Sequence, residues 1–172
     1  NVTGKITLYA KTEIGFKNLT KLSSLSYLKS KETEEPSCKI EDLIENNKDL
    51  ILLSGSCRDF FGKLFLTNKI KQFDEIINIL KKTFNERIYL EIQRHNDEDE
   101  KIFENHLLSK SKLFEIPLIA TQEVFYISKD MYEAHDALTC IGDKSFIDDN
   151  KRFRYSNQHF LKDNNDLVKL YS

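Results

Sequence analysis

Acidic and histidine side chains stand at the predicted ends of two strands. Glu123 follows the run "PLIAT" and its polar neighbour, and His95 follows the run "RIYLEIQ". Because functional side chains of α/β proteins gather at the carboxyl ends of strands, both residues are candidates for metal binding or proton transfer. His135, next to Asp136 in a predicted helix, is the third candidate ligand. The ordinary alternative is a strand-end histidine and a His–Asp pair on a helix surface.

Other polar residues carry weaker chemical signals. Ser56 and Cys57 follow the apolar run "LILLSG", but no base stands beside that thiol in the sequence. The acidic run 97–100 suits the solvated first turn of a helix, where carboxylates meet the positive end of the helix dipole. A metal trap is the alternative for this run. His106 and His159 are expected on a surface helix and a surface loop.

Composition excludes several classes of protein. The chain has 172 residues, of which 40% are hydrophobic and 31% are charged, and this balance is typical of an ordered globular domain. The net charge of -2 offers no basic surplus for binding a phosphate backbone. No apolar run approaches the length of a membrane span, so we expect no membrane partner. The odd number of cysteines, with no C-x-x-C pair, predicts thiols in a reducing cytosol and therefore a cytoplasmic protein.

The pattern of apolar residues predicts strands that alternate with helices. The continuous apolar run at 50–55 is typical of a strand buried on both faces, as in a parallel sheet. The strongest helix signal is an apolar stripe over 69–84. The predicted strands are 5–10, 50–55, 87–93 and 117–121, and the predicted helices are 13–28, a short one from 40, 69–84, one after 100, 130–140 and 163–171. The order predicts one α/β domain over 1–172 with mainly parallel strands.

Six ordered blocks of the sequence resemble one family. They are "LYAKTEIGFKNLTKLSSLSYL", "DLILLSGS", "RIYLEIQRHND", "IPLIATQEVFYI", "EAHDALTCIGD" and "DDNKRFRYSNQHFLKDNNDLVKLY". Their order and spacing resemble the PHP (polymerase and histidinol phosphatase) domain of the bacterial DNA polymerase III α subunit. The resemblance covers essentially the whole chain, although no single block decides it.

The resemblance implies a fold and a setting. The fold would be a distorted, partial β/α barrel, because the first strands of the domain would lie upstream of this chain. The setting would be a replicative DNA-directed DNA polymerase, whose catalytic aspartates and magnesium ions lie in a separate palm domain. The implied partners are a proofreading exonuclease subunit, the remaining domains of the α subunit and, through the longer chain, DNA.

The resemblance also implies a metal site, and this chain departs from it. Some members hold divalent metals with side chains at strand ends, whereas in others the site has decayed. The ligand positions are here Lys5 for a histidine, Ser56 for a cysteine, Glu123 for an aspartate and Phe125 for a histidine. Neither an ammonium nor a phenyl ring offers a lone pair to a metal. We therefore expect a degenerate site, with no bound metal, no cofactor and no catalytic residue in this segment.

Three interpretations follow. In the first, the segment is structural and docks the exonuclease, and Lys5, Ser56, Glu123 and Phe125 face one shared cavity without a metal. In the second, His95, Glu123 and His135 bind metal in a phosphoesterase or 3′-5′ exonuclease. In the third, the chain is an independent interaction module that shares the fold.

Overall fold

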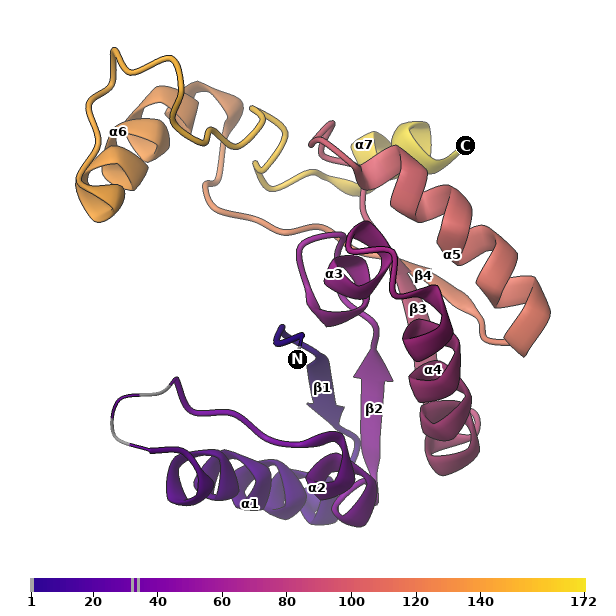
Figure 1. The fold of residues 1–172 in the computed structure, drawn as a ribbon. Helices are drawn as coiled ribbons and strands as arrows, with labels where there is room; N and C mark the ends of the chain where they lie inside the picture. Colours follow the sequence, from indigo (N-terminus) through magenta and orange to yellow (C-terminus); the bar gives the residue numbers. More distant parts are fainter. Residues whose placement is uncertain (1, 32, 34) are drawn as a thin grey trace. The chain divides into compact units, whose positions relative to one another are not determined.

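The computed structural model describes residues 2–31, 33 and 35–172 (Figure 1). Strands and helices alternate over much of this part of the chain, as predicted. In chain order the elements are β1 (Thr7–Ala10), α1 (Glu13–Lys29), α2 (Ile40–Glu45), β2 (Leu50–Leu53), α3 (Phe60–Leu66), α4 (Ile70–Phe84), β3 (Ile88–Ile92), α5 (Glu100–Phe114), β4 (Leu118–Ala120), the 3-10 turn η1 (Lys129–Met131), α6 (Tyr132–Asp143) and α7 (Asn164–Tyr171). Among the described residues, no helix is both long enough and apolar enough to cross a membrane.

The strands form one mainly parallel sheet in the order β1-β2-β3-β4. β1 pairs antiparallel with β2, and β2 pairs parallel with β3. β4 lies beside β3, where the Leu90 N–H donates to the Pro117 carbonyl at 3.0 Å. The predicted α/β class with mainly parallel strands is confirmed. The described strands form an open sheet, with β1 and β4 at its edges, and not a closed barrel.

The chain divides into two compact units. Unit 1 comprises residues 1–91 and 106–119, and unit 2 comprises residues 92–105 and 120–172. The prediction of a single domain over 1–172 therefore stays a prediction.

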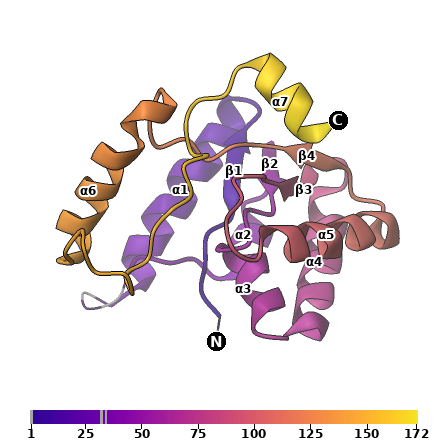
Figure 2. The same cartoon turned by 90° about the horizontal axis from the view of Figure 1, so that it is seen from above.

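The core of unit 1 is built on α4. Its apolar stripe was predicted from the sequence, and Phe73, Ile77, Leu80 and Phe84 are fully buried. In the views of Figures 1 and 2, α4 runs beside α5, and a Lys110–Asp74 ion pair joins the two helices. The fully buried core side chains of this unit also include Phe61, Leu50, Leu52, Leu64, Ile88, Leu90, Leu107 and Ile116.

The start of α1 is fixed by its contact with the turn before β2. The Thr12 hydroxyl caps this helix, because it accepts a hydrogen bond from the Gly15 N–H while donating to Asp49 at 2.7 Å. Gly15 is required because a Cβ there would lie 2.2 Å from the Asp49 carbonyl oxygen. On this helix Leu22 is buried, whereas Phe16 is 64% exposed.

Unit 1 also contains a helix that was not predicted and a histidine whose surroundings differ from the prediction. Helix α3 was not predicted, because the short run "FFGKLFL" is apolar apart from Lys63 and shows no helical periodicity. Four of its residues are buried. His106 is half-buried and does not lie fully on the expected helix surface. Its ring packs between Phe65 and Phe73, with centroids 4.6 and 5.0 Å away, and its Nε2 atom is buried without a hydrogen-bond partner in the described structure.

We expect His106 to make unit 1 sensitive to acid. Burial lowers the pKa of the imidazole from its usual 6.5, and the nearby Lys110 ammonium acts in the same direction. The unfolded chain therefore binds this proton more readily than the folded chain does. The resulting stability is complete above about pH 6.5 and is lost as the pH falls towards the folded pKa.

The test is the pH dependence of urea denaturation in wild type and His106→Phe. The substitution keeps a ring between Phe65 and Phe73, so we expect a shallower fall in the free energy of unfolding between pH 7 and pH 5. Equal slopes for the two proteins in this interval would contradict the assignment.

Candidate functional site

The four positions of the predicted degenerate site are divided between the units. Lys5 and Ser56 belong to unit 1, and Glu123 and Phe125 belong to unit 2. Lys5 is exposed, and its carbonyl accepts a hydrogen bond from the Phe60 N–H at 3.1 Å. That Lys5, Ser56, Glu123 and Phe125 face one shared cavity stays a prediction.

In unit 1, polar groups at the ends of β2 and β3 bind one another. Ser56 uses both its N–H and its hydroxyl to bind Asp59 Oδ2, each at 2.8 Å. Glu91 is buried and accepts a hydrogen bond from the Gly55 N–H at 3.1 Å, while its own N–H donates to the Ser54 hydroxyl at 2.9 Å. Sequence reasoning missed Glu91, and the available signal was one carboxylate inside an otherwise apolar strand.

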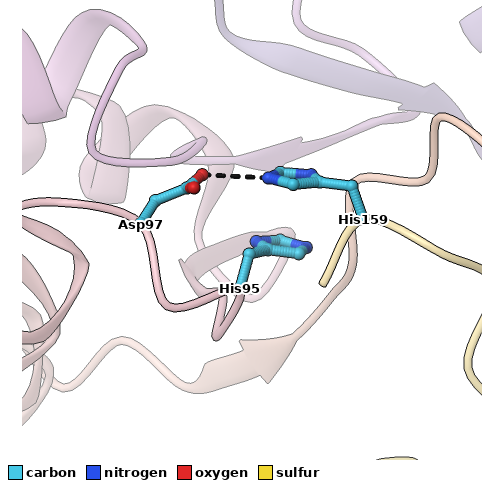
Figure 3. A group of neighbouring side chains, drawn as sticks. All are labelled: His95, Asp97 and His159. Atoms are coloured by element: carbon cyan, nitrogen blue, oxygen red, sulfur yellow. Dashed lines mark hydrogen bonds and ion pairs between the residues drawn. The ribbon is translucent and has the colours of Figure 1, made fainter. Parts of the chain in front are cut away.

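In unit 2, His95, Asp97 and His159 form a compact group of possible ligand atoms (Figure 3). One side-chain ligand atom from each lies within 4.8 Å of the other two. His95 and Asp97 lie in the loop between β3 and α5, and His159 lies next to the bridge that pairs Tyr126 with Phe160. The expectation that His159 lies on a surface loop is wrong, because its side chain is 0% exposed.

The hydrogen bonds of His95 assign its tautomer. Its Nδ1 faces Glu100 Oε1 at 2.8 Å, and its Nε2 faces the Glu123 N–H at 3.0 Å. A carboxylate only accepts and an N–H only donates, so the neutral ring carries its proton on Nδ1. The other oxygen of Glu100 accepts from the main-chain N–H groups of His95 and Asp97, at 2.7 and 3.2 Å. Part of the acidic run therefore points inward, contrary to the expected solvated turn.

His159 lies between two acceptors. Its Nδ1 is 3.1 Å from the Glu123 carbonyl oxygen, and its Nε2 is 3.0 Å from Asp97 Oδ2. When Asp97 is ionised, both ring nitrogens must donate to satisfy both contacts, and the imidazolium form is the one that does so. Asp97 is also buried, with 6% of its side chain exposed, and its Oδ1 accepts from the Ser156 N–H at 3.1 Å. Asp97 and His159 thus form a buried, hydrogen-bonded pair, which is an ion pair when His159 is protonated.

Four rings stack in a column through this site. The His95 and His159 rings are parallel to within 4°, with centroids 4.2 Å apart. Phe125 stacks on His159 at 4.8 Å, and His135 stacks on Phe125 at 4.9 Å. Two rings therefore separate His135 from His95, and the Glu123 carboxylate, 48% exposed, has its Oε2 3.9 Å from His159 Nδ1.

The sequence profile of the PHP domain matches residues 2–95. The chain belongs to the PHP domain family. This PHP chain is 33% identical over 167 residues to the DNA polymerase III subunit alpha of Caulobacter vibrioides, 32% over 171 residues to that of Rickettsia bellii, and 30% over 169 residues to that of Vibrio cholerae. The alignments cover 97%, 99% and 98% of the chain, which spans about 15% of the length of each relative.

The PHP family implies divalent metal, so the fit of the His95–Asp97–His159 group to a metal matters. A metal lies close to the plane of each imidazole that binds it, about 2.0–2.1 Å from the nitrogen. Parallel rings stacked 4.2 Å apart cannot both contain one ion in their planes. All four ring nitrogens also face protein partners. In this arrangement the group does not fit a shared metal ion.

Asp136 was expected beside His135 on a helix surface, but in unit 2 it forms a buried ion pair with Arg152. Asp136 is 4% exposed, and Arg152 donates to it from Nη1 at 2.7 Å and also from Nη2. The Arg152 hydrogen bonds hold the pKa of this carboxyl below its usual range. Arg154 adds a contact at 3.0 Å, so two cations from the segment after α6 are fixed to that helix.

We expect Asp136→Asn to destabilise unit 2. Arg152 would keep its charge without the carboxylate that it binds, and loss of one partner of such a pair lowers the free energy of unfolding. Glu133→Gln is the matched control on the same helix, because Glu133 is 77% exposed and its contact with Arg154 is 3.7 Å long. It should change the free energy of unfolding by less than about 0.5 kcal/mol. Urea denaturation followed by circular dichroism measures both, and similar losses in the two variants would contradict the assignment.

Proposed function

We propose that this chain is a segment of the α subunit of a bacterial DNA polymerase III and acts in the cytoplasm as a structural and docking region of that subunit. The observation that carries the proposal is the match to relatives of that name, which extends over 97% to 99% of the chain in the three alignments above. A PHP domain alone would not indicate a polymerase, because a fold can host many functions. The continuous match beyond residue 95 supplies the narrower assignment.

In this proposal, nucleotide incorporation belongs to the longer polypeptide. Magnesium ions would act in its palm domain, and DNA would meet this segment only through the longer chain. The open sheet would be part of a distorted β/α barrel, with β1 as the strand at which further strands pair. The segment would support the polymerase domains and bind the proofreading exonuclease subunit.

Two side chains favour docking over hydrolysis. The resemblance would place Lys5 and Phe125 at positions where metal-binding members have histidines, and neither side chain supplies a lone pair. Phe125 also packs on the His159 and His135 rings, so its side chain fills space between them. The competing function is a metal-dependent phosphoesterase or 3′-5′ exonuclease, and the grouping of His95, Asp97 and His159 is the observation in its favour.

The two functions differ in their reaction products. We expect the purified chain to incorporate no nucleotides on a primed template and to release none from a 3′ end with magnesium, manganese or zinc. The full-length polypeptide that carries this sequence should extend the primer under the same conditions. Metal-dependent release by the chain that disappears in Glu123→Ala would establish the phosphoesterase instead.

Docking is tested separately from chemistry. We expect the proofreading exonuclease subunit of the same organism to form a saturable complex with the chain in isothermal titration calorimetry. A bovine serum albumin titration serves as the control for non-specific contact. Binding by the full-length polypeptide but not by this chain would place the docking surface elsewhere.

A further inference from the structure

We propose that His159, held in its protonated form, takes the place of a metal ion in unit 2 and ties together three segments that are distant in the sequence. The segments are 95–100, 121–125 and 156–159. This inference concerns hydrogen bonds within the chain itself, and it does not depend on which longer polypeptide contains the chain.

The contacts of His159 are those of a bound cation. It lies between a carboxylate, Asp97, and a main-chain carbonyl, that of Glu123, at 3.0 and 3.1 Å. Oxygen atoms of these two kinds are also ligands of hard metal ions. Here the positive charge belongs to the protein, because the imidazolium supplies it from a residue that is 0% exposed. A buried carboxylate needs such a partner to remain charged.

The remaining contacts close the connection between the segments. The Ser156 hydroxyl donates to the His95 carbonyl, and the Ser156 N–H donates to Asp97. His95 receives the Glu123 N–H on one side and donates to Glu100 on the other. Segment 156–159 thus donates hydrogen bonds to both other segments, and segment 121–125 donates one to segment 95–100. We call this cluster the imidazolium lock.

A metal ion would have to break the imidazolium lock in order to bind. Stacked parallel rings cannot share an ion, so one ring would have to rotate out of the column and leave a buried partner without its hydrogen bond. The positive charge on His159 would also repel a divalent cation that bound to His95 or Asp97 beside it. The lock and a metal are therefore alternative occupants of the same place.

The role of Glu123 in the lock belongs to its main chain. Its N–H binds His95 and its carbonyl binds His159, whereas its carboxylate is 48% exposed and has its Oε2 3.9 Å from the nearest ring nitrogen. Removal of the Glu123 side chain should therefore leave the lock intact. This separates the lock from a metal site, in which the carboxylate would be the ligand.

The experiment compares melting temperatures of wild type, His159→Phe, Asp97→Asn and Glu123→Ala, each with EDTA and with excess zinc, manganese or magnesium. His159→Phe keeps a ring in the column but removes both hydrogen bonds, and Asp97→Asn leaves the imidazolium without its counter-ion. We expect each to lower the melting temperature by about 10 °C, as for loss of one partner of a buried pair in a chain of this size. Glu123→Ala should change it by less than about 2 °C, and no metal should raise that of wild type.

Two results would overturn the proposal. One is a saturable rise in the wild-type melting temperature with a metal that is absent in Asp97→Asn. The other is a His159→Phe variant as stable as wild type. If the variants fail to fold, the wild-type chain still decides: nitrogen-15 NMR of its histidines should show one imidazole with both nitrogens protonated, and only neutral rings would refute the lock.

Discussion

The buried hydrogen bond between His159 and Asp97 is the interaction on which the rest of unit 2 depends. This unit has little regular pairing of its own, because the bridge between Tyr126 and Phe160 is isolated and the helices join long irregular segments. Where strands do not satisfy buried polar groups, side chains must do so. Two buried pairs, Asp97–His159 and Asp136–Arg152, do this for the loop before α5 and for the segment after α6. Unit 1, by contrast, rests on an apolar core around α4.

This difference explains what the sequence could predict. The stripe on α4 and the apolar run of β2 have periodicities that reflect their own burial, so their elements were predicted correctly. The acidic run 97–100 was predicted as a solvated turn, and Glu98 and Asp99 are indeed exposed. Asp97 and Glu100 turn inward only because His159 and His95 meet them. A contact between residues 62 positions apart, such as that of Asp97 with His159, has no local signature in one sequence.

Family membership and site chemistry are separate conclusions for this chain. The PHP profile ends at residue 95, while most of the imidazolium lock lies beyond it. The resemblance implied four metal-ligand positions, which are Lys5, Ser56, Glu123 and Phe125. Neither Asp97 nor His159 is among these four positions. A group with the composition of a metal-binding triad can therefore hold protons in its hydrogen bonds instead of a metal ion. The donor and acceptor of each hydrogen bond distinguish these two kinds of site.

The column of stacked rings has an evolutionary consequence. His95, His159, Phe125 and His135 each fill space that the next ring needs, so a smaller side chain at one level removes support from its neighbours. Selection then acts on the four positions jointly, and a change at one is tolerated when a neighbour compensates in volume. Single substitutions in the column are therefore disfavoured in any lineage that has it. Among relatives, substitutions at the four positions should be correlated.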